Sequence, residues 1–230
     1  MRLSNIIRAG VVAGLLSAGS MTAFADAIGP FECEGGFCGG TLDIFNNLPG
    51  TRLDSATDSS WNAIDAWGNT LYGGVLRSAV YQNASNTLDF YYQFTSSGAS
   101  IFSVGRLAMT NFAGFTTNVG YRMDNWDNEG QFLTGTQAPI SADRSASGGT
   151  VGFSFFGLGG KIDPNETSAT LVIRTNASAY NTAGSISAQY GVLYTPAAFA
   201  PTTGSAVPEP GTYMMMGTGL IALFALRRHK

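Results

Sequence analysis

Histidine is almost absent from this sequence of 230 residues, because the only one is His229, the penultimate residue. No internal position can therefore supply the imidazole on which Ser-His-Asp and Cys-His nucleophilic catalysis depend. Zinc sites with histidine ligands and the iron site of two histidines and one carboxylate are excluded for the same reason. Any catalysis by this chain would have to use carboxylates, tyrosine, lysine or a hard cation bound through oxygen.

Charged side chains are also scarce, at 12% of the residues, about half of the ~25% found in ordinary soluble domains. Ser, Thr and Asn together number 57, so neutral polar groups take the place of charge on the surface. With 12 Lys and Arg against 15 Asp and Glu and no long basic run, the chain has no basic patch that could bind nucleic acid phosphates. A nucleic-acid partner is excluded, while an apolar content of 44% can support a packed core.

The N-terminal residues have the three parts of a secretory signal peptide. Arg2 and Arg8 precede the short apolar stretch 9–19, and Ala23-Phe24-Ala25 then forms an A-x-A site in front of Asp26. The alternative is a retained membrane anchor, but the apolar stretch is too short and too rich in glycine for a span of about 20 residues. We therefore predict that the secretion machinery exports the chain and that residues 1–25 are removed, with Asp26 as the new N-terminus.

The C-terminal residues combine a proline-rich motif, an uncharged stretch and a basic cluster. Val207-Pro208-Glu209-Pro210 precedes the uncharged segment 211–226, and Arg227, Arg228 and Lys230 follow it. This order resembles the PEP-CTERM sorting signal of Gram-negative bacteria, which a membrane protease or transpeptidase called exosortase recognises. The resemblance is limited to residues 207–230. It implies sorting and an exosortase partner, and it implies nothing about the activity of the preceding residues.

The physical properties of this segment agree with a temporary membrane anchor. As a helix, the 16 residues 211–226 would span only ~24 Å, less than the ~30 Å hydrocarbon core. Arg227 and Arg228 favour the cytoplasmic side, which leaves the preceding chain outside the inner membrane. The two prolines keep the backbone around Glu209 extended and accessible to a protease. We expect transient anchoring in the inner membrane and then a cell-surface or extracellular location; a permanent anchor is the alternative.

The body of the chain, residues 26–206, has 14 acidic and 7 basic side chains, and its 181 residues suit one domain. In segment 88–94 the even-numbered residues are apolar and face one way, while Asp89, Tyr91 and Gln93 face the other, as in a strand with one buried face. Further strands are predicted at 41–48, 71–82, 101–111, 116–123, 151–156, 169–176 and 185–194. This pattern predicts an all-β fold, a single jelly-roll-like β-sandwich.

One short helix is predicted at 59–67, because Ser59 could cap it and Trp61, Ile64 and Trp67 fall close to one helical face. In this interpretation the two tryptophans pack against the core. The alternative is that both lie on a sheet face as a platform for stacking sugars.

Two short motifs could hold a covalent bridge or a metal ion. Cys33 and Cys38 have four residues between them, and in an exported protein a disulfide is the simplest interpretation. A metal site would need further soft ligands, which the body lacks. The acidic stretch 124–130 is similar to a calcium loop, but Trp126 and Glu129 break the EF-hand spacing. We expect a solvated loop there, and no metal, cofactor or catalytic residue in the body.

Two hypotheses remain for the function of the body. The first is a non-enzymatic cell-surface or biofilm-matrix protein, for which exopolysaccharide is the candidate partner. The second is a secreted carbohydrate-binding domain, or a hydrolase that places two carboxylates on opposite sides of a glycosidic bond. The 14 body carboxylates keep the second hypothesis open, although none stands in a diagnostic motif.

Overall fold

The computed structural model describes residues 28–30, 32–35, 38, 41–47, 49–126, 130–157, 160–189 and 197–204. The predicted signal peptide and sorting segment lie outside these ranges. The regular structure of the described residues consists of eleven strands: β1 (Cys33–Gly35), β2 (Thr51–Ile64), β3 (Thr70–Gln82), β4 (Leu88–Ser96), β5 (Arg106–Thr110), β6 (Thr117–Arg122), β7 (Ser141–Arg144), β8 (Thr150–Ser154), β9 (Thr170–Thr175), β10 (Ala179–Gln189) and β11 (Ala197–Thr202).

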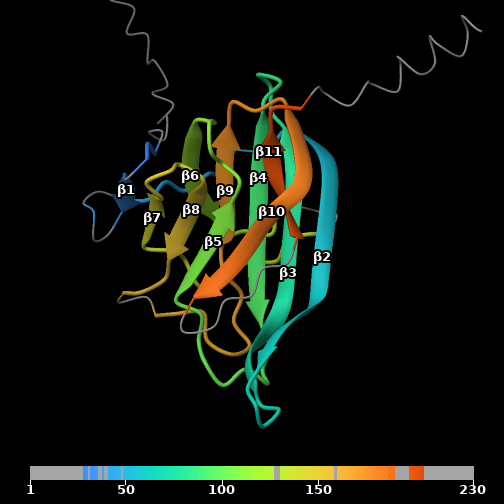
Figure 1. Cartoon of the computed structure of the whole chain (residues 1–230), viewed down its shortest axis with the longest axis vertical. Helices are drawn as coiled ribbons and strands as arrows, with labels where there is room; N and C mark the ends of the chain where they lie inside the picture. Colours follow the sequence, from blue (N-terminus) through green and yellow to red (C-terminus); the bar gives the residue numbers. More distant parts are fainter. Residues whose placement is uncertain are drawn as a thin grey trace, which may run out of the picture.

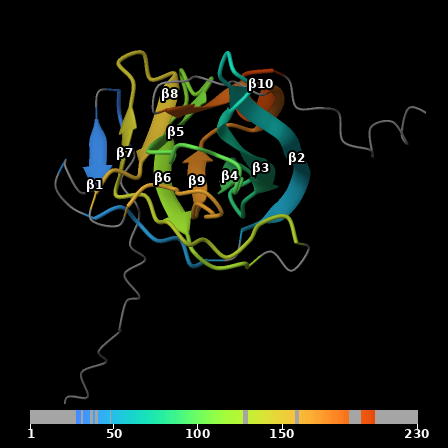
Figure 2. The ribbon, with the colours of Figure 1, turned by 90° about the horizontal axis from the view of Figure 1, so that it is seen from below.

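These strands form two sheets that lie face to face (Figure 1). One sheet has five strands in the order β2-β3-β4-β9-β6, and the other has six in the order β1-β7-β8-β5-β10-β11. Neighbouring strands within each sheet are antiparallel. Figure 2 shows β5, β8 and β10 on one side and β3, β4, β6 and β9 on the other.

Strand β4 lies at the centre of the core between the sheets. Its even-numbered residues from Leu88 to Phe94 are buried in one cluster with Leu107, Met109 and Phe153 of the opposite sheet. The Tyr92 hydroxyl donates a 2.6 Å hydrogen bond to the Phe199 carbonyl and so joins β4 to β11 across this core. The packing confirms the predicted all-β, sandwich-like fold and the inner face assigned to this strand.

Strands β3, β4, β6, β8 and β9 agree with the sequence predictions to within two residues at each end. Segment 101–111 is a strand only over β5, β10 begins before residue 185, and residues 190–194 lie outside the described ranges. The strand predicted at 41–48 is absent from the described residues there, which form only an isolated bridge between Ile44 and Tyr121. Strands β1, β2, β7 and β11 were not predicted.

The jelly-roll part of the prediction, which concerns how the strands are connected, stays a prediction. An eight-stranded jelly roll is built from two Greek keys. Here β2, β3 and β4 are sequential neighbours in one sheet, because the short turns 65–69 and 83–87 connect each strand directly to the next.

The helix predicted at 59–67 is wrong, because β2 continues to Ile64 and pairs with β3 as far as Thr70. The chain then turns at 65–69, where the Asp65 carboxylate accepts hydrogen bonds from the backbone of Trp67 and Asn69. Trp67 is 86% exposed and Ile64 is 61% exposed, so neither packs in the core. The helical spacing in the sequence is a coincidence, which the cross-strand ladder and the turn chemistry override.

Candidate functional site

The outer face of the five-stranded sheet carries a second buried cluster, which we call the outer-face cluster: Phe45, Ala79, Tyr81, Tyr91, Phe132 and Val172. Trp126 packs against it. The predicted solvent face of β4 is therefore wrong, since Asp89, Tyr91 and Gln93 are 2%, 0% and 0% exposed. Phe45 and Phe132 come from loops that cross this face, and these loops cover it.

The Gln93 side chain fastens one of these loops to β4. Its amide nitrogen donates to the Leu133 carbonyl at 2.7 Å, and its amide oxygen accepts from the Leu133 backbone N–H at 2.8 Å. The reciprocal pair satisfies both polar ends of a fully buried side chain, as burial of an amide requires.

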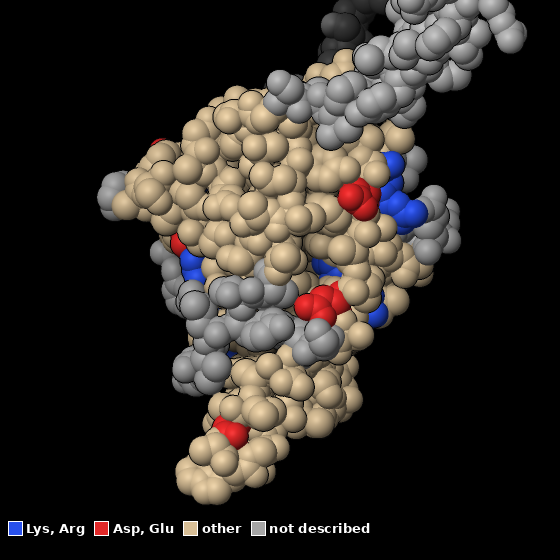
Figure 3. All heavy atoms as spheres, turned by 45° about the vertical axis from the view of Figure 1, so that its right-hand side comes forward, with Lys and Arg blue, Asp and Glu red and all other residues tan. Residues whose placement is uncertain are grey.

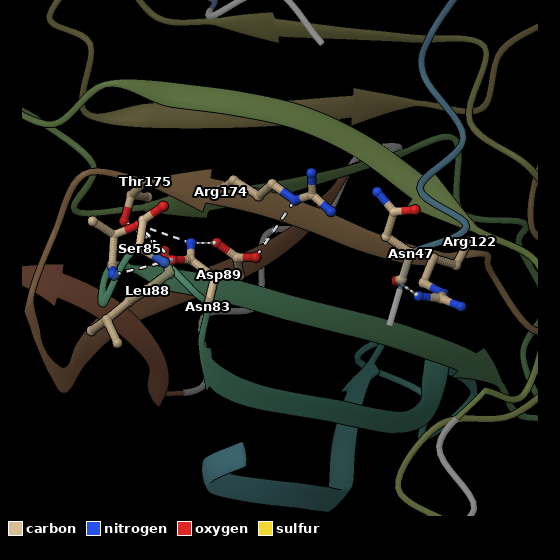
Figure 4. A network of polar contacts seen from close by, with 9 residues as sticks. Asn47, Asn83, Ser85, Leu88, Asp89, Arg122, Arg174 and Thr175 are labelled. Atoms are coloured by element: carbon tan, nitrogen blue, oxygen red, sulfur yellow. Dashed lines mark hydrogen bonds and ion pairs between the residues drawn. The ribbon is translucent and has the colours of Figure 1, made fainter. Parts of the chain in front are cut away.

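An ion pair between buried Asp89 and half-buried Arg174 lies beside the outer-face cluster (Figure 4). Asp89 on β4 and Arg174 on β9 are register partners, and the Asp89 Oδ2 atom lies 3.5 Å from the Arg174 Nε atom. The Asn83 side chain donates to the other carboxylate oxygen at 2.9 Å. Burial raises the pKa of Asp89, against the hydrogen bond from Asn83 and the charge of Arg174. The Arg174 guanidinium also lies 4.0 Å from the centre of the Phe45 ring, a cation–π contact.

Arg122 makes a second connection between this sheet and the covering loops. Its Nε and Nη2 atoms donate to both Asp124 carboxylate oxygens at 3.0 and 2.9 Å, and its Nη1 atom donates to the Asn47 carbonyl. Its guanidinium lies 4.8 Å from the centre of the Trp126 ring. The hydrogen bond from Arg122 lowers the pKa of Asp124. Because Arg122 is 2% exposed, its guanidinium holds the covering loops against the sheet.

One open hollow of about 470 Å³ lies where β2, β3 and β4 approach the 97–99 turn. We call it the glycine hollow, and its described lining is small and uncharged: Ser59, Asn62, Thr70, Gly73, Gly74, Val75, Thr95, Ser96, Ser97, Gly98, Ala99 and Asn165. Hydroxyl and amide groups dominate this lining, and no carboxylate is among these residues.

Another open hollow of about 480 Å³ lies beside Arg144 and the start of the described chain, and its lining includes one carboxylate, Glu32. Arg144 is 7% exposed and donates hydrogen bonds to four backbone carbonyls, those of Ile28, Phe112, Phe115 and Gly148. Burial lowers the pKa of Arg144. The four bonds connect three chain segments, so the Arg144 guanidinium stabilises the fold beside this hollow.

The predicted disulfide and the acidic loop are described only in part. Cys33 and Cys38 are bonded to each other with their Cα atoms 5.8 Å apart. Asp124, at the start of the acidic loop, is paired with Arg122, whereas residues 127–129 lie outside the described ranges. Within the described ranges, no group of three or more His, Cys, Asp or Glu residues is placed to hold a metal ion.

Sequence reasoning missed the polar network around Asp89, Arg122 and Arg174. A signal for it was present, because strands β4, β6 and β9 were predicted and their outward positions carry charges of both signs. The residues predicted for signal cleavage and for sorting lie outside the described ranges, so their roles stay predictions. In the part of the chain that the structure describes, no helical segment has the length and apolar character that a membrane crossing needs.

Comparison with known proteins gives one match, at the C-terminal end of the chain. No curated protein and no solved structure matches the chain. Residues 206–228 match the PEP-CTERM protein-sorting motif, in agreement with the resemblance found at 207–230. The motif implies export and membrane-associated sorting toward the cell surface through the exosortase pathway. The chain therefore carries a PEP-CTERM sorting motif directly after its folded body.

Proposed function

We propose that this is an exported, non-enzymatic cell-surface or extracellular-matrix protein. Segment 211–226 holds it briefly in the inner membrane, and exosortase processes it beside Pro208-Glu209-Pro210. The match of residues 206–228 to the sorting motif is the observation that carries this proposal. The signal peptide predicted at 1–25 supplies the export step that sorting at the outer side of the membrane requires.

The arrangement of the carboxylates supports a body without hydrolase activity. Glycoside hydrolysis uses two carboxyl groups separated by about 5 to 9.5 Å. The glycine hollow has no carboxylate in its described lining, and the hollow beside Arg144 has one. Three other carboxylates of the body, Asp89, Asp124 and Asp143, are paired with arginines. Each of these three carboxylates has an arginine partner, which favours a role in stabilising the fold over a role in catalysis.

Expression in a Gram-negative host with and without an active exosortase tests this proposal. With the enzyme, the intact mass of the protein should lack the residues that follow the Pro-Glu-Pro motif. Without it, the protein should keep Lys230 and remain in the membrane fraction. Identical masses in the two hosts would contradict the proposed route.

A glycan-binding role is the second candidate function of the body, with exopolysaccharide as the partner. The neutral hydroxyl and amide lining of the glycine hollow favours it, because neutral sugars bind through hydrogen bonds to such groups. Glycan-array binding of the mature protein, with and without calcium, tests this role. Asn62→Arg places a long side chain at the hollow and should abolish binding, whereas Ala84→Arg, in the turn 83–87, should not.

A further inference from the structure

The two ends of the described chain leave the sandwich at the same end of the molecule (Figure 1). Thr202, the last residue of β11, pairs with Ala179 at the start of β10. Ile28 donates a 2.8 Å backbone hydrogen bond to Thr117 at the start of β6. Both predicted membrane-directed segments, 1–25 and 207–230, therefore connect to one end of the body.

Four turns make up this end, and we call them the near-end turns: 83–87, 111–116, 145–149 and 176–178. Hydrogen bonds connect three of them: Phe112 N to Gly149 O (3.0 Å) and Thr116 N to Asn176 Oδ1 (3.0 Å). Leu88, the first residue of β4 after turn 83–87, donates to the Ala177 carbonyl at 2.9 Å. None of their residues is charged. Two carboxylates lie nearby. Asp89 is buried and pairs with Arg174, whereas Glu32 is exposed and keeps its negative charge, although it accepts a hydrogen bond from the Gly29 backbone.

The connections at the opposite end of the strands carry charged residues: Asp65, Asp124, Lys161, Asp163 and Glu166. Strand β3, with 13 residues, runs between the two ends. At ~3.3 Å per residue, about 40 Å separates them. Figure 3 shows how sparse charge is on the face of the molecule that it presents. The charges are thus distributed unevenly along the strand direction.

We propose that the near-end turns are a surface that faces the lipid headgroups while the C-terminal segment spans the membrane. This inference rests on the proposed function. From Thr202 to Gly211, where the membrane-spanning segment begins, the chain can extend by at most about 30 Å. The near-end turns therefore lie closer to the membrane than the opposite end, which is about 40 Å further along the strands.

Electrostatics favours the same orientation. The potential of an anionic membrane decays within a Debye length, about 8 Å at physiological ionic strength. The acidic residues of the opposite end, about 40 Å away, are outside its reach. The uncharged near-end turns can approach the headgroups without repulsion, although the body as a whole has twice as many acidic as basic residues.

Fluorescence quenching in vesicles tests this orientation. Residues 26–230 are reconstituted in vesicles of phosphatidylcholine and anionic phosphatidylglycerol that carry a quencher on the headgroup. A fluorophore is attached to Ser85→Cys in a near-end turn, or to Ala66→Cys at the opposite end as the matched control. We expect at least about threefold stronger quenching at position 85, because ~40 Å separates the two ends. Equal quenching, or stronger quenching at position 66, would overturn the proposal.

A pair of charge variants separates lipid contact from contact with exosortase. Two added carboxylates, Ala84→Glu with Ala146→Glu, should reduce the quenched population about tenfold in anionic vesicles and leave it unchanged in neutral ones. The control pair, Ala66→Glu with Ala99→Glu, should have no effect in either. If the first pair slows exosortase processing but changes no quenching, the surface contacts the enzyme and the lipid proposal is wrong. Because the vesicles contain no exosortase, a failure of the processing route itself would appear only in the cell experiment.

Discussion

Asp89 and Arg174 face each other across β4 and β9, with Oδ2 3.5 Å from Nε, on a sheet face that the alternation of β4 predicts to be solvated. The Arg174 guanidinium also lies over the Phe45 ring. The pair therefore joins β4 to β9, and Arg174 also contacts the covering loop that carries Phe45. Removing one partner of such a pair leaves the other charge without compensation.

Asp89 and Asp124 should give opposite dependences of stability on pH. Burial raises the pKa of Asp89 above its ordinary value of 3.8, so ionisation of Asp89 lowers the free energy of unfolding as the pH rises through the raised pKa. The stability advantage of the wild type over Asp89→Asn should therefore shrink as the pH rises.

The pKa of Asp124 is lowered, so its contribution is present at neutral pH and is lost as the pH falls through that pKa. The advantage of the wild type over Asp124→Asn should grow as the pH rises. Thermal unfolding of the three proteins between about pH 3 and pH 7 measures both trends. Trends of the same sign in the two variants would contradict this assignment.

Arg122→Lys should destabilise the protein by about 2 kcal/mol, because lysine cannot reproduce the paired hydrogen bonds to Asp124 or the bond to Asn47. Arg106→Lys is the matched control. Arg106 also pairs with a carboxylate, that of Asp143, but its side chain is 23% exposed against 2% for Arg122. We expect a loss of less than about 1 kcal/mol there. Urea unfolding measures the loss of stability in both variants. Equal losses would show that the deeper burial of Arg122 does not make its contacts more stabilising.

The sequence of β4 illustrates how far the fold could be predicted. Period-2 alternation assigned the even-numbered residues to the inner face correctly, because the strand geometry determines on which side a residue lies. It could not show that loops cover the other side, where Tyr91 and Gln93 are buried. The loop that carries Phe45 has the pattern of a strand, predicted at 41–48, but in the structure it forms only an isolated bridge between Ile44 and Tyr121. Whether a loop covers the outer face of a strand depends on tertiary contacts, which a local sequence pattern does not show.

The helix error at 59–67 has a related cause. Trp61, Ile64 and Trp67 have helical spacing, but the decisive information is the 13-residue partner strand β3 that follows the turn. Pairing over this length outweighs a weak local preference. The sorting motif was recognised at once because its order of residue types is local and needs no tertiary information.

The exposed and the packed tryptophan should differ in their effect on stability. Trp67→Ala should change the free energy of unfolding by less than about 0.5 kcal/mol, since Trp67 is 86% exposed. Trp126→Ala should cost about 3 kcal/mol, because Trp126 packs on Tyr81, Tyr91 and Phe132. Chemical denaturation of both variants measures the difference. A large loss of stability for Trp67→Ala would contradict the exposed position of Trp67 at the tip of the β2–β3 hairpin.

The disulfide should be formed in the exported protein but should contribute little to stability. Thiol labelling under denaturing, non-reducing conditions should modify neither Cys33 nor Cys38. The double variant Cys33→Ser with Cys38→Ser should lose no more than about 2 kcal/mol, because the bond closes a very short loop. Two labelled cysteines in the mature protein would contradict the expected redox state.

Glu209→Ala should block C-terminal processing if the extended Pro208-Glu209-Pro210 segment is the recognised handle. The variant should accumulate in the membrane fraction as a precursor that keeps Met214 to Lys230. Ala84→Ser, far from the motif in sequence and exposed in a near-end turn, is the control and should be processed normally. Normal processing of Glu209→Ala would show that the glutamate is not part of the recognised segment.

The central claim is that the body is delivered through cleavage at its C-terminal sorting motif. Its most direct test is the intact mass of the wild-type protein recovered from cells that contain exosortase. The account predicts a protein that begins at Asp26 and lacks the segment 211–230, including Lys230. Recovery of a protein that still ends at Lys230 would contradict it and would favour a permanent membrane anchor.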